Sequence, residues 1–144
     1  MYKLTIELVP EGCWNVNLRT AFPALWDKIR HDAYARAKGR CMICGVQTRR
    51  LEAHERWSYD EGRAVQKLET VVALCHACHE VKHIAFAQMR GRGVDVMEHF
   101  MRVNGCSQMD YHAALSAANE EHRRRNRIDC WQTDLTWLKE NYNL

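Results

Sequence analysis

The alternation of hydrophobic and polar residues predicts the first elements of the chain. Residues 2–9 place apolar side chains at every second position, which is typical of a half-buried strand. In residues 21–39 apolar side chains recur every three or four positions, which indicates a helix. Pro23 suits the first turn of that helix and Gly39 suits its end.

The middle of the chain favours strands followed by a helix. We expect two or three short strands, at about residues 49–55, 64–68 and 70–75, the last being rich in β-branched residues. Residues 56–63 contain Asp, Glu and Gly and are interpreted as the loop between the first two. From Cys75 the pattern becomes helical through about Met89.

The last third of the chain is predicted to be mainly helical. One helix is expected at residues 94–105, ending at Gly105. A second covers residues 107–127 and begins with Ser107 and Asp110 at the spacing of a capping box. After it we expect a strand near residues 129–135 and then a helical turn.

Length and composition indicate one ordinary globular domain spanning residues 1–144. At 144 residues with 47% hydrophobic and 27% charged residues, the chain can bury a core and gives no sign of disorder. The net charge of +3 is compatible with a nucleic-acid partner but does not argue for one alone. The N-terminus lacks the apolar run of a secretory signal and no stretch is long enough to span a membrane, so we expect a cytoplasmic protein without a membrane partner.

Cysteine spacing predicts a structural zinc site. Four of the seven cysteines form two CxxC pairs, and a CxxC on a tight turn offers two thiolates to one ion. Strands that fold back between the pairs would bring all four together. The predicted zinc ligands are Cys41, Cys44, Cys75 and Cys78.

Three histidines predict a second metal site next to the first. His79 and His83 are four residues apart and would share one face of the helix that begins near His76. His54, in the strand at residues 49–55, would be brought against the start of that helix. The string from His79 to His83 also spells the HExxH of zinc peptidases, in which Glu80 would activate water.

The order of these motifs resembles the HNH endonuclease family of the ββα-metal fold, in the variant with two zinc knuckles. A CxxC is followed by a histidine near the end of a strand and then by "LCHACH" entering a helix. The segments "LEAHERWSYD", "VALCHACHEVKH", "FAQMRGR" and "VNG" are similar to small bacterial and phage proteins described as HNH endonucleases. The resemblance implies an α+β fold, with a ββα-metal core at about residues 38–90. An N-terminal strand and helix precede the core, and a helical extension at about residues 91–144 follows it.

The resemblance also implies an activity, the metal-dependent hydrolysis of DNA phosphodiester bonds. His54 matches the general base of the family, and His79 and His83 match ligands of its catalytic ion, which would be Mg²⁺, Mn²⁺, Ni²⁺ or Zn²⁺. Two positions depart from the family pattern. Thr70 stands where the family has an asparagine that braces the loop of the base. Ala53 stands where an aspartate or histidine often binds the ion.

These departures leave alternatives open. Glu55 would replace the missing acidic ligand if the chain turned after His54, or His54 would itself bind the ion as the third histidine. The chain could also be a module that keeps the fold and binds nucleic acid or a protein without cleavage. DNA is the expected partner, with RNA as an alternative, and the oligomeric state is left open, a homodimer included. The predicted phosphate-binding residues, which flank the site in sequence, are Arg49, Arg50, Arg90 and Arg92.

Overall fold

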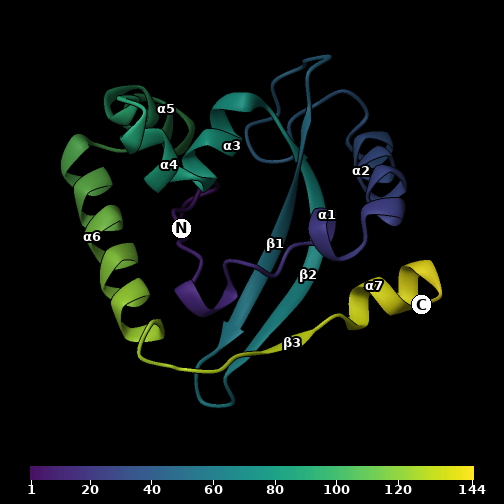
Figure 1. The fold of residues 1–144 in the computed structure, drawn as a ribbon. Helices are drawn as coiled ribbons and strands as arrows, with labels where there is room; N and C mark the ends of the chain where they lie inside the picture. The colour runs from purple at the N-terminus through teal and green to yellow at the C-terminus, as the bar shows by residue number, and fades with distance from the viewer.

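A three-stranded sheet lies at the centre of the computed structural model, which describes residues 1–144 (Figure 1). Strand β1 (Glu52–Asp60) pairs antiparallel with β2 (Val65–Leu74) to form a long hairpin. The short strand β3 (Gln132–Asp134) lies parallel to the other side of β2. The strand order is β1-β2-β3, so β1 is an edge strand.

Helices flank the hairpin on both sides. In Figure 1 one group that includes α3 to α6 lies on one side, and α2 and α7 lie on the other. The protein is therefore α+β, and no helix is both long and apolar enough to cross a membrane. The helical elements are η1 (Glu11–Cys13), α1 (Leu18–Ala21), α2 (Pro23–Ala37), α3 (His76–Lys82), α4 (Ile84–Met89), α5 (Gly93–Asn104), α6 (Gln108–Arg125) and α7 (Thr136–Tyr142).

Two hydrophobic clusters lie on opposite faces of the hairpin. Successive side chains of a strand point to opposite faces of a sheet, and β2 follows this rule. Val72 and Leu74 belong to the cluster shared with α3 to α6, whereas Val71 and Ala73 belong to the cluster shared with α2 and α7. The continuous β-branched and apolar run at the end of β2 is thus explained by burial on both faces.

The predicted N-terminal strand at residues 2–9 is wrong, because these residues form neither strand nor helix. The alternation itself is real, since Leu4 and Ile6 are buried in the cluster beside α3. Side chains take the place of a partner strand: Leu4 N–H donates to Asn104 Oδ1 at 3.0 Å, and Asn104 Nδ2 donates to the Leu4 carbonyl at 2.8 Å. Lys82 Nζ donates to the Thr5 carbonyl at 3.0 Å. Alternate side chains of this segment are therefore buried although its backbone pairs with no strand.

The predicted boundaries of the hairpin also need correction. Most of the expected loop at residues 56–63 belongs to β1, so His54 is the third residue of a nine-residue strand and the chain does not turn after it. The two short strands expected after the loop are one continuous β2. The pairing between β1 and β2 contains a β-bulge. Arg56 pairs with Thr70, but the next residue, Trp57, pairs with Leu68, so Glu69 has no partner in β1. The polar side chains of residues 56–60 suggested a loop, but an edge strand such as β1 can carry polar side chains at its exposed positions.

The helices were predicted more accurately. Pro23 occupies the first turn of α2, and Gly105 ends α5 with a positive φ of 61°. Ser107 and Asp110 form the expected capping box of α6, with both hydrogen bonds present. The single helix expected through Met89 is divided into α3 and α4, because the backbone at His83 leaves the helical conformation.

Candidate metal centres

The four cysteines of the two CxxC pairs converge on one point. Their Sγ atoms come within 4.8 Å of one another, with sulfur–sulfur separations of 3.7–3.8 Å. Four thiolates at zinc–sulfur distances of 2.3 Å in a tetrahedron would lie ~3.8 Å apart, so the spacing matches a bound zinc ion. No disulfide joins them. The cluster could therefore hold a zinc ion, as the spacing predicted.

Local hydrogen bonds place the first pair of cysteines against the hairpin. Gly45 has a positive φ of 79° and donates its N–H to the Cys41 carbonyl at 2.9 Å, which closes a tight turn around the pair. Met42 N–H donates to the Ala73 carbonyl at 3.0 Å. This bond ties the turn to β2 just before the second pair begins, so a short stretch of backbone fixes both halves of the site.

The second pair lies at the junction of β2 and α3. Cys75 is the N-cap of α3, and its Sγ accepts a hydrogen bond from Cys78 N–H at 3.4 Å. Cys78 is fully buried, and His99 from α5 lies with Nε2 3.2 Å from its Sγ. A zinc ion bound here would join the α2–β1 loop, the end of β2 and the start of α3.

The thiols differ in how readily they ionise. Burial tends to raise the pKa of Cys41, but hydrogen bonds from backbone N–H groups around the site outweigh burial and lower it to about 7. Burial raises the pKa of Cys75 to about 11, and that of Cys78 moves further in the same direction. A bound cation would therefore displace protons from these two buried thiols, which couples zinc binding to pH.

Three histidines form a second cluster beside the first. His54 comes from β1, His79 from α3 and His83 from the C-terminal cap of α3, and their ring nitrogens come within 4.8 Å of one another. The Nε2 atoms of His79 and His83 are 3.0 Å apart. Two nitrogens on a tetrahedral zinc ion would lie ~3.3 Å apart, which is close to this spacing. The structure thus brings together the three histidines that the sequence singled out.

Desolvation keeps two of these histidines neutral. Burial, followed by electrostatic repulsion from His79, His83 and Lys82, lowers the pKa of His54 to about 3. Desolvation by its neighbours also lowers the pKa of His83, although part of this side chain is exposed to solvent. At neutral pH both rings therefore offer a free lone pair, which is the form that accepts a proton or binds a cation.

Glu52 is a member of this site that the sequence interpretation missed. Its Oε1 atom lies 2.7 Å from His79 Nδ1, and its Oε2 atom lies 2.9 Å from His76 Nδ1. A histidine that donates through Nδ1 to a carboxylate presents its Nε2 lone pair to the other side, here toward His83. The available signal was the two-residue spacing between Glu52 and His54, which places both side chains on one face of β1.

The other two proposed catalytic residues do not join the histidines. Glu55 follows His54 in β1 and therefore points to the opposite face, where its carboxylate accepts hydrogen bonds from Leu18 N–H at 2.7 Å and Trp57 Nε1 at 3.0 Å. Burial raises the pKa of Glu55. Thr70 pairs with Arg56 across the hairpin and makes its nearest side-chain hydrogen bond to the Val71 carbonyl. Neither residue belongs to the histidine cluster, although Glu55 lines the same cavity as the three histidines.

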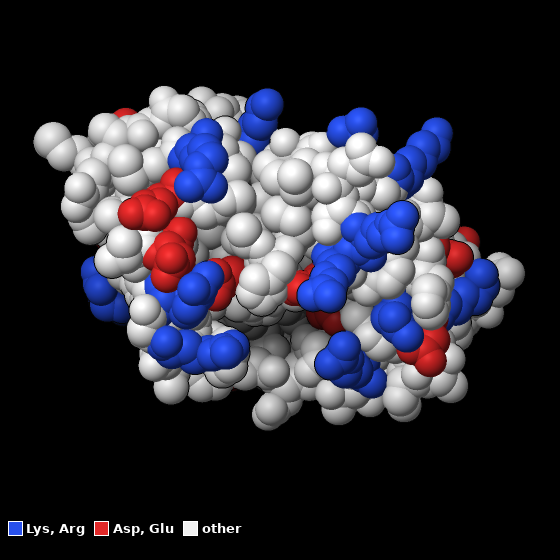
Figure 2. All heavy atoms as spheres, turned by 90° about the horizontal axis from the view of Figure 1, so that it is seen from above, with Lys and Arg blue, Asp and Glu red and all other residues white.

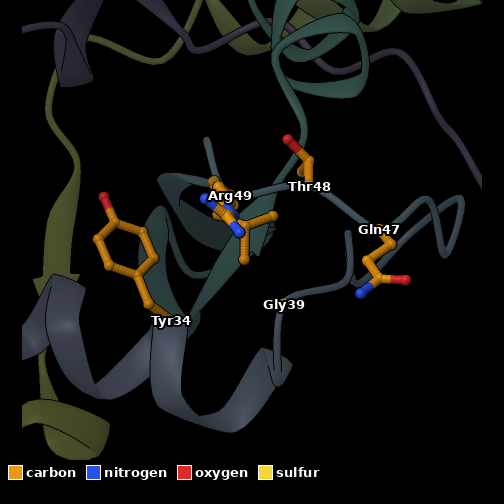
Figure 3. Close-up of a pocket in the computed structure, with 6 residues that line it drawn as sticks. Tyr34, Gly39, Gln47, Thr48 and Arg49 are labelled. Carbon is orange, nitrogen blue, oxygen red and sulfur yellow. The ribbon is translucent and has the colours of Figure 1, made fainter.

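The four predicted phosphate-binding arginines differ in their surroundings. Arg49 lines a cavity with Tyr34 at the end of α2 (Figure 3). The Arg90 guanidinium lies 5.4 Å from the ring centroid of Phe86. Arg50 precedes β1, and its backbone N–H donates to Thr48 Oγ1. On the face shown in Figure 2, basic side chains lie on both sides of a hollow.

Arg92 is neutralised by the protein itself. Its guanidinium forms two hydrogen bonds with Glu80, at 2.9 and 3.1 Å, and an ion pair with Asp95 at 3.2 Å. These contacts reduce its capacity to bind a phosphate. They also occupy Glu80, the residue that an HExxH peptidase would need beside its metal-bound water, so the site geometry argues against that hypothesis.

Comparisons with protein-family models, curated proteins and solved structures found no match for this chain. The resemblance to HNH endonucleases therefore stays a prediction.

Proposed function

We propose that this chain is a metal-dependent endonuclease of the HNH type that hydrolyses phosphodiester bonds in DNA. The observation that carries the proposal is the order and convergence of its parts. An antiparallel hairpin leads into a short helix, and histidines from the strand, the helix and the helix cap meet in one cluster. The four-cysteine cluster lies at the same hairpin–helix junction and could fix it with zinc.

Each histidine has a separate task in this proposal. His79 and His83 would hold a divalent ion through their Nε2 atoms, which lie 3.0 Å apart. Such an ion supplies positive charge to the phosphate oxygens as negative charge builds up on them. His54, whose ring is neutral at pH 7, accepts the proton of the attacking water. Exposed His83 leaves the cluster open to a large substrate.

Glu52 orients the ligand ring in this scheme, which leads to a prediction. Replacing Glu52 with Gln should weaken binding of the second ion by about 10- to 100-fold, because the carboxylate that fixes the His79 ring is lost. Competition against a chromophoric zinc chelator would measure the change. Glu69→Gln is a matched control, since Glu69 lies in the same hairpin but accepts a hydrogen bond from Ser58. Equal affinity in wild type and Glu52→Gln would contradict the role of Glu52.

Plasmid cleavage tests the proposed function directly. Purified protein is incubated with supercoiled DNA and Mg²⁺, Mn²⁺, Ni²⁺ or Zn²⁺, and nicking is followed on gels. We expect nicking with at least one ion and its loss in His79→Ala, while Glu80→Gln retains activity. Absence of nicking by the wild type with every ion would refute the endonuclease. Cleavage of peptides that depends on Glu80 would instead support a peptidase.

A second candidate function follows from the positions of Glu55 and Thr70. Neither contributes to the histidine cluster, so the site lacks both an acidic ligand and an amide brace. These features fit a zinc-stabilised module that binds nucleic acid without cleaving it. Binding of DNA by wild type together with absence of nicking would favour this candidate.

A further inference from the structure

Three cavities adjoin one another along the surface beside the histidines. The first, about 570 Å³, is lined by all three histidines of the cluster. A second, about 300 Å³, shares His79 and Arg19 with the first. A third, about 640 Å³, shares Tyr34 with the second. Because neighbouring cavities share wall residues, Tyr34 alone in the case of the second and third, the three lie side by side; this row of cavities beside the histidine cluster is called the furrow.

Exposed aromatic rings lie in the wall of the first cavity. Trp14 is 62% exposed and Phe86 is 60% exposed, although burial of such rings would be favourable. Trp14 is held in place, because its Nε1 donates to the Val9 carbonyl at 2.8 Å. Phe86 carries the guanidinium of Arg90 near its ring. Trp14 is thus a fixed, solvent-facing ring suited to stacking against a flat ligand, and Phe86 is a second solvent-facing ring.

Cationic side chains also line the furrow. The carboxylates in the same walls are engaged within the protein: Glu7 pairs with Lys82, Glu52 contacts His76 and His79, and Glu55 accepts hydrogen bonds from Leu18 N–H and Trp57 Nε1. Arg19, shared by the first two cavities, has its guanidinium 5.9 Å from the Trp26 ring centroid. It forms no direct ion pair, although its charge partly offsets the burial that raises the pKa of Glu55. Arg49 lines the third cavity and also forms no such pair. Figure 3 shows Arg49 between Tyr34 and the Thr48 side of that cavity. By contrast, Arg92 and Arg124 are each paired with carboxylates.

This combination of groups fits an unpaired polynucleotide better than a duplex. In a duplex each base is covered on both faces by its neighbours, so a protein ring can stack only on a base that has left the stack. Grooves that bind single strands combine cations along the backbone with aromatic platforms for the bases. The furrow has the aromatic rings Trp14 and Phe86 in its first cavity, Arg19 and Arg49 further along and the histidine cluster in its wall.

We propose that this furrow binds single-stranded nucleic acid, with bases stacked on Trp14 and Phe86 and phosphates held by Arg19 and Arg49. The inference rests on the proposed function, since it names the substrate of the same site. The proposal predicts that the nucleic acid reaches the histidines in unpaired form, as a free end, a loop or a displaced strand.

Binding measurements without added divalent ion test the proposal. A fluorescently labelled 12-nucleotide DNA strand is compared with the 12-base-pair duplex of the same sequence by anisotropy. We expect the single strand to bind at least about tenfold more tightly. Trp14→Ala should weaken single-strand binding by roughly fivefold to a hundredfold, the range that stacking contributes per base, while Trp14→Phe should retain most of it. Arg19→Ala should lower the slope of log affinity against log salt by about 0.7.

Arg123→Ala serves as the matched control for the arginine variants, because Arg123 is exposed on α6 and lies outside all three cavities. Equal or tighter binding of the duplex would overturn the proposal. So would effects of Trp14→Ala and Arg19→Ala no larger than that of Arg123→Ala. The two proposals fail separately: nicking of plasmid without single-strand preference refutes only the furrow, and single-strand binding without nicking refutes only the endonuclease.

Discussion

Replacing Cys78 with serine should abolish zinc binding at the four-cysteine cluster and with it the cooperative unfolding transition. Cys78 is fully buried and belongs to the larger hydrophobic cluster, so the zinc site and that core are one structural unit. Structural zinc contributes about 10–16 kcal/mol in small zinc-binding peptides, as much as the whole stability of a typical domain. Zinc content by colorimetric release and thermal unfolding by circular dichroism would measure both effects.

Cys13→Ser is the control for this experiment. Cys13 is also buried, at 2% exposure, but lies outside the four-cysteine cluster. Its replacement removes a comparable buried thiol and leaves the metal ligands intact, so zinc content should not change and the loss of stability should be small. A Cys78→Ser protein with undiminished zinc and an unchanged melting temperature would show that the four cysteines do not hold a structural ion.

The sequence predicted the cysteine cluster because ligand spacing is local. Within each CxxC pair, two residues between the ligands are enough to place both thiols on one turn, whatever the rest of the fold does. Only the closure of the hairpin had to be assumed. The same logic located His54 opposite the two helix histidines, because an antiparallel hairpin that leads into a helix brings its first strand back to the helix start.

Features that depend on distant partners were not predictable in the same way. The alternation at residues 2–9 indicates one buried side, but whether a strand forms depends on a neighbour for its backbone, and Asn104 takes that place. The availability of an arginine for phosphate depends on nearby carboxylates: Arg92 is paired, whereas Arg19, which the sequence analysis did not single out, is not. Charge patterns along a chain do not specify such tertiary pairs.

The role of Glu52 depends on both local sequence spacing and a tertiary contact. Its two-residue spacing from His54 was visible in the sequence, but its role required the position of α3, which brings His76 and His79 to its two carboxylate oxygens. The cluster thus has a carboxylate that orients the His79 ring. In the endonuclease proposal, Glu52 would raise the affinity of the second ion by fixing the His79 ring, and it does so from the position just before Ala53 in β1.

His54→Ala should separate proton transfer from metal binding. If His54 is the base, its loss should lower the nicking rate by about 10²- to 10⁴-fold while the second ion remains bound, whereas His79→Ala should lose both. Nicking rates at saturating ion, together with the metal content of each variant by mass spectrometry, would measure both effects.

His76→Ala is the control, because His76 contacts the same Glu52 but lies outside the cluster. This variant should retain both nicking and the second ion. Loss of the second ion in His54→Ala would contradict the base assignment. It would make His54 the third ligand, as the mutual approach of the three rings also permits.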